Sequence, residues 1–470
     1  LVTADHMHPQ AREQSGIYPI PHARDAFAAR ALLARAAEQT LDVQYYIWRG
    51  DLTGTLLLTA LLNAAERGVR VRLLLDDNGT SDLDSELAAL DAHPNVEIRL
   101  FNPFTNRSRK WLGYLTDFSR ANRRMHNKSF TVDNQASIVG GRNVADEYFG
   151  ATDGVLFSDL DVLAVGPIVN ATSADFDRYW SSESAYSIRQ ILPPADPLDL
   201  PPLTERAARI ERDPKAAAYV DAIRQLPLLG QLLRGDLPLM WAKTRLVSDD
   251  PAKGRNAASK DGLLTRQLAE ILGAPKHEVF LISPYFVPTA AGVAAFTQWV
   301  EQGVKVRVLT NSFEATDVAV VHAGYSKHRK ALLAGGVVLY ELRSRGASDA
   351  PAMKKSALGS SGSSLHAKTF VTDASQVFVG SFNFDPRSIN LNTELGFVID
   401  SPDLAADILA ASAEQLPASA YEVRLNADGN LVWIEQSSDK ERSLDTEPGA
   451  GFWQRLGIRL LSLLPIEWLL

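Results

Sequence analysis

The sequence predicts an α/β protein of two similar halves, each an α/β/α sandwich with a mixed sheet, related by pseudo-two-fold symmetry. Three observations lead to this prediction. The chain has 470 residues, enough for two core-forming units of roughly 200 residues each. Apolar residues make up 46% of it and charged residues 22%, as in globular proteins that bury a large core. A long internal repeat divides it into two halves in register.

The repeat is a recurring order of strands and helices. Residues 41–48 form an apolar run typical of a buried strand, and residues 64–75 indicate a helix end that leads into another strand. Residues 278–286 and 300–309 repeat both features, and a glycine, Gly68 or Gly303, stands where each helix stops. The next strands, 95–100 and 336–342, also match, and predicted helices at 26–39 and 55–67 favour helices on both faces of each sheet.

The domain boundaries follow from the repeat and from local composition. The two halves span residues 16–195 and 261–425. Residues 196–260 are rich in proline, which breaks helices and strands, so a linker with an insertion is expected there. Residues 344–364 predict a loop, either an active-site flap or an ordinary solvated loop. Residues 426–470 are expected to form a tail with an amphipathic helix.

Each half contains one segment of the form His-x-Lys-x-x-x-x-Asp, and both segments continue with Gly, a small residue and Asn at matched spacing. Two matched copies in one chain make a chance occurrence improbable. The candidate catalytic residues are the fixed motif positions, His126, Lys128, Asp133, His366, Lys368 and Asp373. The candidate phosphate-binding or supporting residues downstream are Asn143, Ser381 and Asn383.

The spacing within each motif predicts that its His and Lys side chains act on the same phosphodiester. Positions i and i+2 of a strand point the same way, so His126 and Lys128 are expected on one face, and His366 and Lys368 likewise. If the halves pack about a pseudo-two-fold axis, all four side chains converge. Two ammonium groups then neutralise a phosphodiester, one imidazole attacks phosphorus, and the other protonates the leaving oxygen, with no metal or cofactor required.

Carboxylates are expected to orient the two imidazoles by accepting a ring N–H. The candidates are Glu394 in the second half and Asp161 or Asp159 in the first, although solvated carboxylates at strand ends are the alternative for all three. Asp133 and Asp373 are expected to tie down the turn behind each motif rather than to take part in the chemistry.

The paired segments resemble the HKD motifs of the phospholipase D superfamily. Residues 124–149 resemble bacterial cardiolipin synthases, and residues 157–162, 241–246, 321–325 and 464–470 are similar to their C type. The resemblance implies two phospholipase-D-like halves and a ping-pong transfer through a covalent phosphatidyl-histidine. The acceptor that the resemblance implies is phosphatidylglycerol. The implied donor is either phosphatidylethanolamine, as in the C type, or a second molecule of phosphatidylglycerol.

The resemblance does not decide which histidine is the nucleophile, and His126 is preferred. Many family members carry Ser where this chain has Gly141, so a hydroxyl contact to phosphate is expected only from Ser381. Phospholipid hydrolysis to phosphatidic acid and a nuclease activity remain alternatives with the same chemistry. The net charge of −8 argues against nucleic acid as a partner. A binding protein that had lost activity would not be expected to keep both His-Lys pairs intact.

Membrane contact is expected to be peripheral, at the bacterial inner membrane. The sequence contains no run of eighteen uncharged apolar residues that would predict a spanning helix. An apolar stripe at residues 452–464 and a basic, amphipathic stretch at 107–124 predict two interfacial segments. Docking of the C-terminal helix onto its own core is the alternative. The expected partners are phosphatidylglycerol and phosphatidylethanolamine, the membrane surface, and a small accessory protein.

Overall fold

The computed structural model describes residues 13–80, 83–107, 109–152, 157–193, 201–344, 364–437, 440–462 and 467. Most of the loop predicted before the second motif, residues 345–363, lies outside the described residues. Within these ranges no helix is long and apolar enough to cross a membrane.

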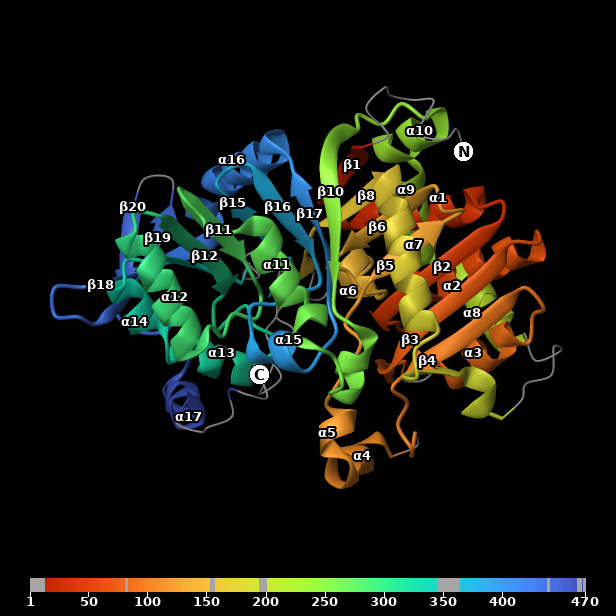
Figure 1. Cartoon of the computed structure of the whole chain (residues 1–470), viewed down its shortest axis with the longest axis horizontal. Coiled ribbons are helices and arrows are strands. Elements are labelled where there is room, and N and C mark those ends of the chain that lie inside the picture. Colours follow the sequence, from red (N-terminus) through yellow and green to blue (C-terminus); the bar gives the residue numbers. More distant parts are fainter. Residues whose placement is uncertain are drawn as a thin grey trace.

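Eighteen strands form one continuous mixed sheet that runs through both halves. Outward from the centre, the first half has the order β1-β8-β6-β5-β2-β3-β4-β9. The second has the order β10-β17-β16-β15-β11-β12-β13-β18-β19-β20. From the β1–β10 junction outward, parallel and antiparallel pairings follow the same succession on both sides. The predicted pseudo-symmetric α/β fold is therefore confirmed (Figure 1).

The elements of the first half, in chain order, are β1 Ser15–Ile20, α1 Ala23–Ala36, β2 Thr40–Ile47, α2 Leu52–Glu66, β3 Arg70–Gly79, α3 Asp84–Asp91, β4 Val96–Phe101, α4 Lys110–Thr116, α5 Phe118–Ala121, β5 Ser129–Val132, β6 Ala136–Gly140, α6 Asp146–Phe149, β7 Phe157–Ser158, β8 Asp161–Val165, α7 Pro167–Trp180 and β9 Ala185–Ser187. The second half and tail comprise β10 Met240–Ser248, α11 Leu264–Leu272, β11 Glu278–Ile282, α12 Thr289–Glu301, β12 Lys305–Asn311, α13 Ala319–Ser326, α14 Arg329–Ala334, β13 Val338–Leu342, β14 Ser364–Leu365, β15 Thr369–Thr372, β16 Gln376–Gly380, α15 Pro386–Asn390, β17 Leu395–Asp400, α16 Pro402–Ser419, β18 Ala420–Leu425, β19 Leu431–Ser437, β20 Lys440–Leu444 and α17 Phe452–Ser462.

The helix-to-strand glycines adopt the conformation that their position demands. Gly68 follows α2 with φ of 94°, and Gly303 follows α12 with φ of 91°. A side chain is strained in this left-handed region, and glycine is not. The core at the junction is shared by the halves, because β6 and β8 pack against β16 and β17 there, with Val139, Val162, Val379 and Phe397 in one cluster. This shared core fixes how the two motifs face each other.

The proline-rich segment differs from the prediction. Instead of breaking helices, Pro201, Pro214 and Pro227 each begin one: α8 Pro201–Glu211, α9 Pro214–Arg224 and α10 Pro227–Arg234. Proline is compatible with the first helical turn, because the N–H that it lacks has no partner there. Leu203, Tyr219, Ile223 and Leu228 from these helices join the core of the first half. The end of the segment forms β10, which joins the two halves, and the tail adds β19 and β20 to the sheet.

Candidate active site

Each histidine motif takes its backbone partner from the opposite half. The amide N–H of His126 donates to the carbonyl of Thr393 at 2.9 Å, and that of His366 donates to the carbonyl of Ser158 at 2.8 Å. The motif His and Lys residues therefore lie in extended segments just before β5 and β15, not within the strands as predicted. The strands begin only where backbone pairing returns to the motif's own half.

The carboxylates that orient the imidazoles are also exchanged between the halves. Nδ1 of His126 lies 2.8 Å from Oε2 of Glu394, and Nδ1 of His366 lies 2.6 Å from Oδ2 of Asp159. A carboxylate that accepts the Nδ1–H leaves the Nε2 lone pair available for chemistry. Neither half alone contains a complete imidazole–carboxylate pair, so one site is built from both.

Asp161, the other candidate, does not lie against an imidazole. Its carboxylate forms ion pairs with Arg30 at 2.8 Å and Arg142 at 3.3 Å. All three side chains are buried, with at most 1% of their surface exposed, so each charge needs its partner. Of the two aspartates that the sequence left open, Asp159 is therefore the one in the site, and Asp161 neutralises the arginines behind it.

The two lysines lie beside the histidines of their own motifs. Nζ of Lys128 donates to the His126 carbonyl at 2.6 Å, and Nζ of Lys368 donates to the His366 carbonyl and lies 3.1 Å from His366 Nδ1. Burial lowers the pKa of Lys368 to about 8 and lowers that of Lys128 well below its ordinary value. Burial lowers the pKa of His126, and the ammonium groups of Lys128 and Lys368, one from each motif, act in the same direction.

The two imidazole–carboxylate pairs differ in protonation. Burial lowers the pKa of His366 to about 4, and Lys368 acts in the same direction. Burial would raise the pKa of Asp159, but the hydrogen bond and charge of His366 hold it at about 2. In the other pair, burial raises the pKa of Glu394 to about 7 and lowers that of His126 well below its ordinary value. At neutral pH Asp159 is thus ionised, whereas Glu394 is near its midpoint.

The final aspartate of each motif has a structural position, as the sequence suggested, and does not lie with the catalytic candidates. At the far end of β5 the carboxylate of Asp133 accepts backbone N–H groups of residues 38–40 at 2.7–2.9 Å. Asp373 does the same for residues 276–278 at 2.7–3.1 Å. Both thus secure the chain entering the neighbouring strand.

The candidate residues that follow each motif mostly form hydrogen bonds to other protein groups of the site. Asn143 accepts the Ile47 N–H at 3.2 Å and donates to the Tyr148 hydroxyl at 3.0 Å. Instead of extending toward a phosphate, the Ser381 hydroxyl donates to Glu394 and accepts the Leu395 N–H. Asn383 is different, because its buried carboxamide oxygen has no hydrogen-bond partner among the described residues.

The two tyrosines that pack against the histidines, and a further carboxylate that supports Glu394, were not identified from the sequence. The rings of Tyr46 and Tyr148 pack edge-on against His126 and His366, each with centroids 5.0 Å apart. Asp249 accepts the backbone N–H of Glu394 at 2.9 Å and pairs with Lys253 at 2.8 Å. Tyr46 lies within the predicted strand 41–48 and Tyr148 follows the first motif, but nothing in the sequence marks Asp249. Among the residues described, no group of three or more His, Asp or Glu side chains is arranged to hold a metal ion.

The lack of a side chain at Gly141 has a structural reason. A Cβ built there would lie 2.2 Å from Oδ1 of Asp159, too close for any real contact. We therefore expect Gly141→Ala to displace the carboxylate from His366 and to lower kcat by about 10–100-fold, the usual cost of losing such an orienting contact. Gly457→Ala, where no atom lies within 4 Å of the added Cβ, is the control. Unchanged kcat in Gly141→Ala would show that the position of Asp159 does not matter.

Comparison with known proteins supports the resemblance that the paired motifs suggest. The family model described as "Cardiolipin synthase, PLD-like domain" matches residues 31–180 and 268–414, one segment in each half. The chain is 51% identical to cardiolipin synthase C of Escherichia coli (strain K12) over 97% of this chain and 96% of that protein. It is 26% identical to cardiolipin synthase A of Pseudomonas syringae pv. syringae (strain B728a) over 89% of this chain and 70% of that protein.

A solved structure confirms the fold. The phosphatidylserine synthase of Haemophilus influenzae Rd KW20 superposes with a TM-score of 0.58, at 13% identity, over 90% of this chain and 92% of that chain. The resemblance and the class of enzyme predicted from the paired motifs are confirmed by the sequence matches. Because both halves match the family model and the identity to one relative extends along nearly the whole chain, the protein belongs to the cardiolipin synthase family of PLD-like enzymes.

Proposed function

We propose that the protein makes cardiolipin by transferring a phosphatidyl group to phosphatidylglycerol. The observation that carries the proposal is the pair of imidazoles, each held at Nδ1 by a carboxylate of the opposite half, beside two buried lysines. This arrangement offers two basic Nε2 atoms and two cations to one phosphodiester. Two relatives aligned over 97% and 89% of this chain are named cardiolipin synthase C and cardiolipin synthase A.

The reaction proceeds in two displacements. Nε2 of one histidine attacks the donor phosphorus and a P–N bond forms. The other histidine, which takes up a proton when the anionic phosphodiester binds beside it, donates that proton to the headgroup oxygen as the bond from phosphorus to this oxygen breaks. The headgroup leaves as ethanolamine from phosphatidylethanolamine, or as glycerol from phosphatidylglycerol. The second histidine then removes a proton from a hydroxyl of the acceptor, whose oxygen displaces the first histidine from phosphorus. Lys128 and Lys368 neutralise the non-bridging oxygens, and the unpartnered oxygen of Asn383 can accept a substrate hydroxyl.

The test is product analysis with purified protein and vesicles that contain radiolabelled phosphatidylglycerol and phosphatidylethanolamine, each labelled in separate reactions. Formation of cardiolipin, with label from phosphatidylethanolamine entering it if that lipid is the donor, supports the proposal. Phosphatidic acid as the sole product would instead identify a hydrolase. Cleavage of DNA without any lipid product would identify a nuclease.

We propose further that the enzyme binds the bacterial inner membrane peripherally through two apolar surfaces. On α4 and α5, Trp111 is 59% exposed, Leu115 73% and Phe118 40%. On α17, Phe452 is 66% exposed and Trp453 78%. Figure 1 shows α4, α5 and α17 projecting from the same lower side of the molecule. Exposed aromatic and aliphatic side chains contribute most to membrane affinity when they enter the headgroup region of a bilayer.

The first of these surfaces is connected to the site. Tyr114 of α4 donates to Asn78 at 3.3 Å, and Asn78 donates to the hydroxyl of Tyr46, whose ring packs on His126. A bilayer in contact with α4 would thus lie close to the chemistry. The alternative for α17, docking on its own core, is also supported, because Ile458 is buried and Glu467 pairs with Lys327 at 2.8 Å. We infer that α17 docks by one face and contacts lipid by the other.

We expect Trp111→Ser/Leu115→Ser and Phe452→Ser/Trp453→Ser each to weaken binding to phosphatidylglycerol-containing vesicles by about tenfold, because each pair removes apolar area that lipid would cover. Co-sedimentation with vesicles measures this. Leu233→Ser is the matched control, since Leu233 is 68% exposed but lies on α10 at the opposite side of Figure 1. Equal binding by all variants would contradict the proposed orientation.

A further inference from the structure

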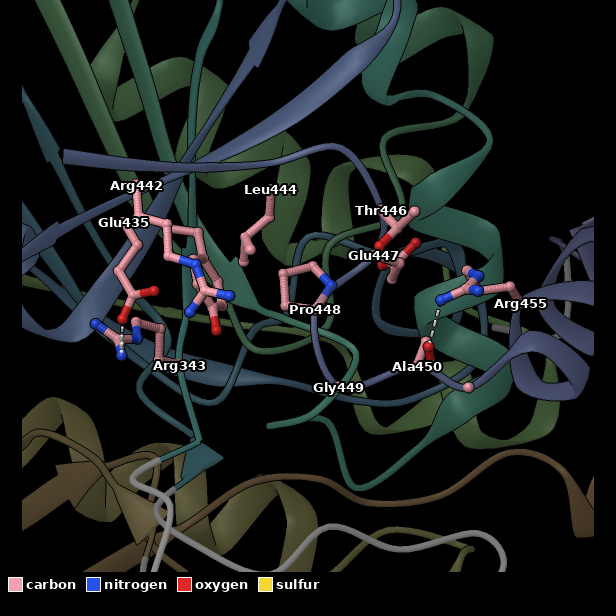
Figure 2. Close-up of a pocket in the computed structure, with 12 residues that line it drawn as sticks. Arg343, Glu435, Arg442, Leu444, Thr446, Glu447, Pro448, Gly449, Ala450 and Arg455 are labelled. Atoms are coloured by element: carbon pink, nitrogen blue, oxygen red, sulfur yellow. Dashed lines mark hydrogen bonds and ion pairs between the residues drawn. The ribbon is translucent and has the colours of Figure 1, made fainter. Parts of the chain in front are cut away.

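The C-terminal tail, together with part of the second half, lines a cavity of about 530 Å³ that includes none of the motif residues. It lies between the β19–β20 hairpin, the end of β13 and the chain segment 446–451 that leads into α17. Figure 2 shows Arg343 and Arg442 on one side of this cavity and Arg455 on the other. Its lining is dominated by charged and polar groups, so it is suited to a ligand that carries charge.

The negative charges of the lining are already neutralised. Glu435 pairs with Arg343. Glu447 accepts hydrogen bonds from Arg329 at 2.9 Å and lies 2.7 Å from Nε2 of His322, both behind the cavity. The carboxylates therefore do not leave the cavity acidic.

Two cations of the lining have no such partner. Among the described residues, neither Arg442 nor Arg455 forms an ion pair with a carboxylate, and Arg455 donates only to the Ala450 carbonyl at 2.6 Å. Arginine guanidinium groups that retain free N–H donors are the usual ligands of phosphate oxygens. Glu314, which accepts the Tyr421 hydroxyl at 3.1 Å, adds a negative charge next to the lining. Among the lining residues themselves three arginines stand against two glutamates, so the lining carries a positive charge.

The position of the cavity indicates what carries that anion. Gly451, which lines the cavity, is followed directly by Phe452 and Trp453, the most exposed apolar side chains of α17. A phosphate in the cavity would therefore have an apolar surface beside it. We propose that this cavity binds an anionic phospholipid, with its charged headgroup between Arg442 and Arg455 and with Phe452 and Trp453 contacting the lipid body.

This site is distinct from the proposed catalytic centre, and its test does not depend on transferase activity. The probe is dihexanoylphosphatidylglycerol, used as monomers so that no membrane surface is present, with binding measured by calorimetry. We expect two classes of site in the wild type. Arg442→Gln/Arg455→Gln should weaken one class by about tenfold or more, because a charge-assisted contact is lost at each residue. The kcat and KM for transfer in detergent micelles should not change.

Controls separate a specific site from general loss of charge and from misfolding. Arg224→Gln/Arg424→Gln removes the same charge from exposed residues outside the cavity and should bind like the wild type. The single variant Arg442→Gln removes no contact that holds the fold and should still weaken binding. An isotherm of Arg442→Gln/Arg455→Gln that matches the wild type would overturn the proposal. Equally tight binding of inorganic phosphate to this site would overturn its assignment to a lipid.

Discussion

His126→Ala and His366→Ala are each expected to lower phosphatidyl transfer by about 10³-fold or more in the purified protein. Loss of a general acid usually costs 10²–10⁴-fold, and loss of a nucleophile costs more. Because each imidazole is held by a carboxylate of the other half, neither can be replaced by a second complete site. The steady-state rate of cardiolipin formation measures this effect.

The same variants can assign the roles of the two histidines. With donor lipid labelled at phosphorus, protein denatured at alkaline pH, where a P–N bond to histidine survives, should retain covalent label only when the nucleophilic histidine is present. At most one of the two variants is therefore expected to incorporate label. His277→Ala is the matched control, since His277 is exposed and donates only its backbone N–H to Asp373. Substantial transfer by either active-site variant would reject a site shared between the halves.

The sequence predicted the parts of this site that depend on local pattern. Gly68 and Gly303 mark equivalent helix ends, and the offset between them places His126 and His366 at equivalent positions of the repeat. The order of strands in the sheet follows the same symmetry. Periodicity and repeat register are properties of the order of residues along the chain, so they can be read without knowledge of the tertiary structure.

The parts that the sequence did not predict depend on contacts between the halves. Asp159 and Asp161 are two residues apart, and only the pairing of β7 with β14 brings Asp159 to His366. The exchange of carboxylates between halves has no local signal either. In the proline-rich segment, Pro214 can break a helix or begin one, and the outcome depends on Tyr219 and Ile223 finding an apolar surface on the first half. Packing, rather than local preference, decided each of these cases.

The two orienting carboxylates are expected to give different pH profiles when each is replaced by its amide. Asp159→Asn and Glu394→Gln should each lower kcat by about 10²–10⁴-fold, because an amide no longer fixes the Nδ1–H tautomer of the imidazole. Asp159, with a pKa of about 2, is ionised throughout an assay between pH 5 and 9, so it contributes no limb to the profile.

Glu394 differs because burial raises its pKa to about 7. Its ionised form, which is the form that accepts the His126 Nδ1–H, is lost as the pH falls through about 7, so kcat/KM of the wild type should decline on that side. On the alkaline side the second limb comes from loss of the lysine ammonium groups as the pH rises, because burial lowers the pKa of Lys368 to about 8 and also lowers that of Lys128.

The amide variants therefore separate the two halves of the site. Asp159→Asn should keep the acid limb near pH 7, whereas Glu394→Gln should lose it, since glutamine does not titrate. Both should keep the alkaline limb. An acid limb that persists in Glu394→Gln would mean that another group governs it. A limb lost in Asp159→Asn instead would mean that the two carboxylates have the opposite electrostatic environments.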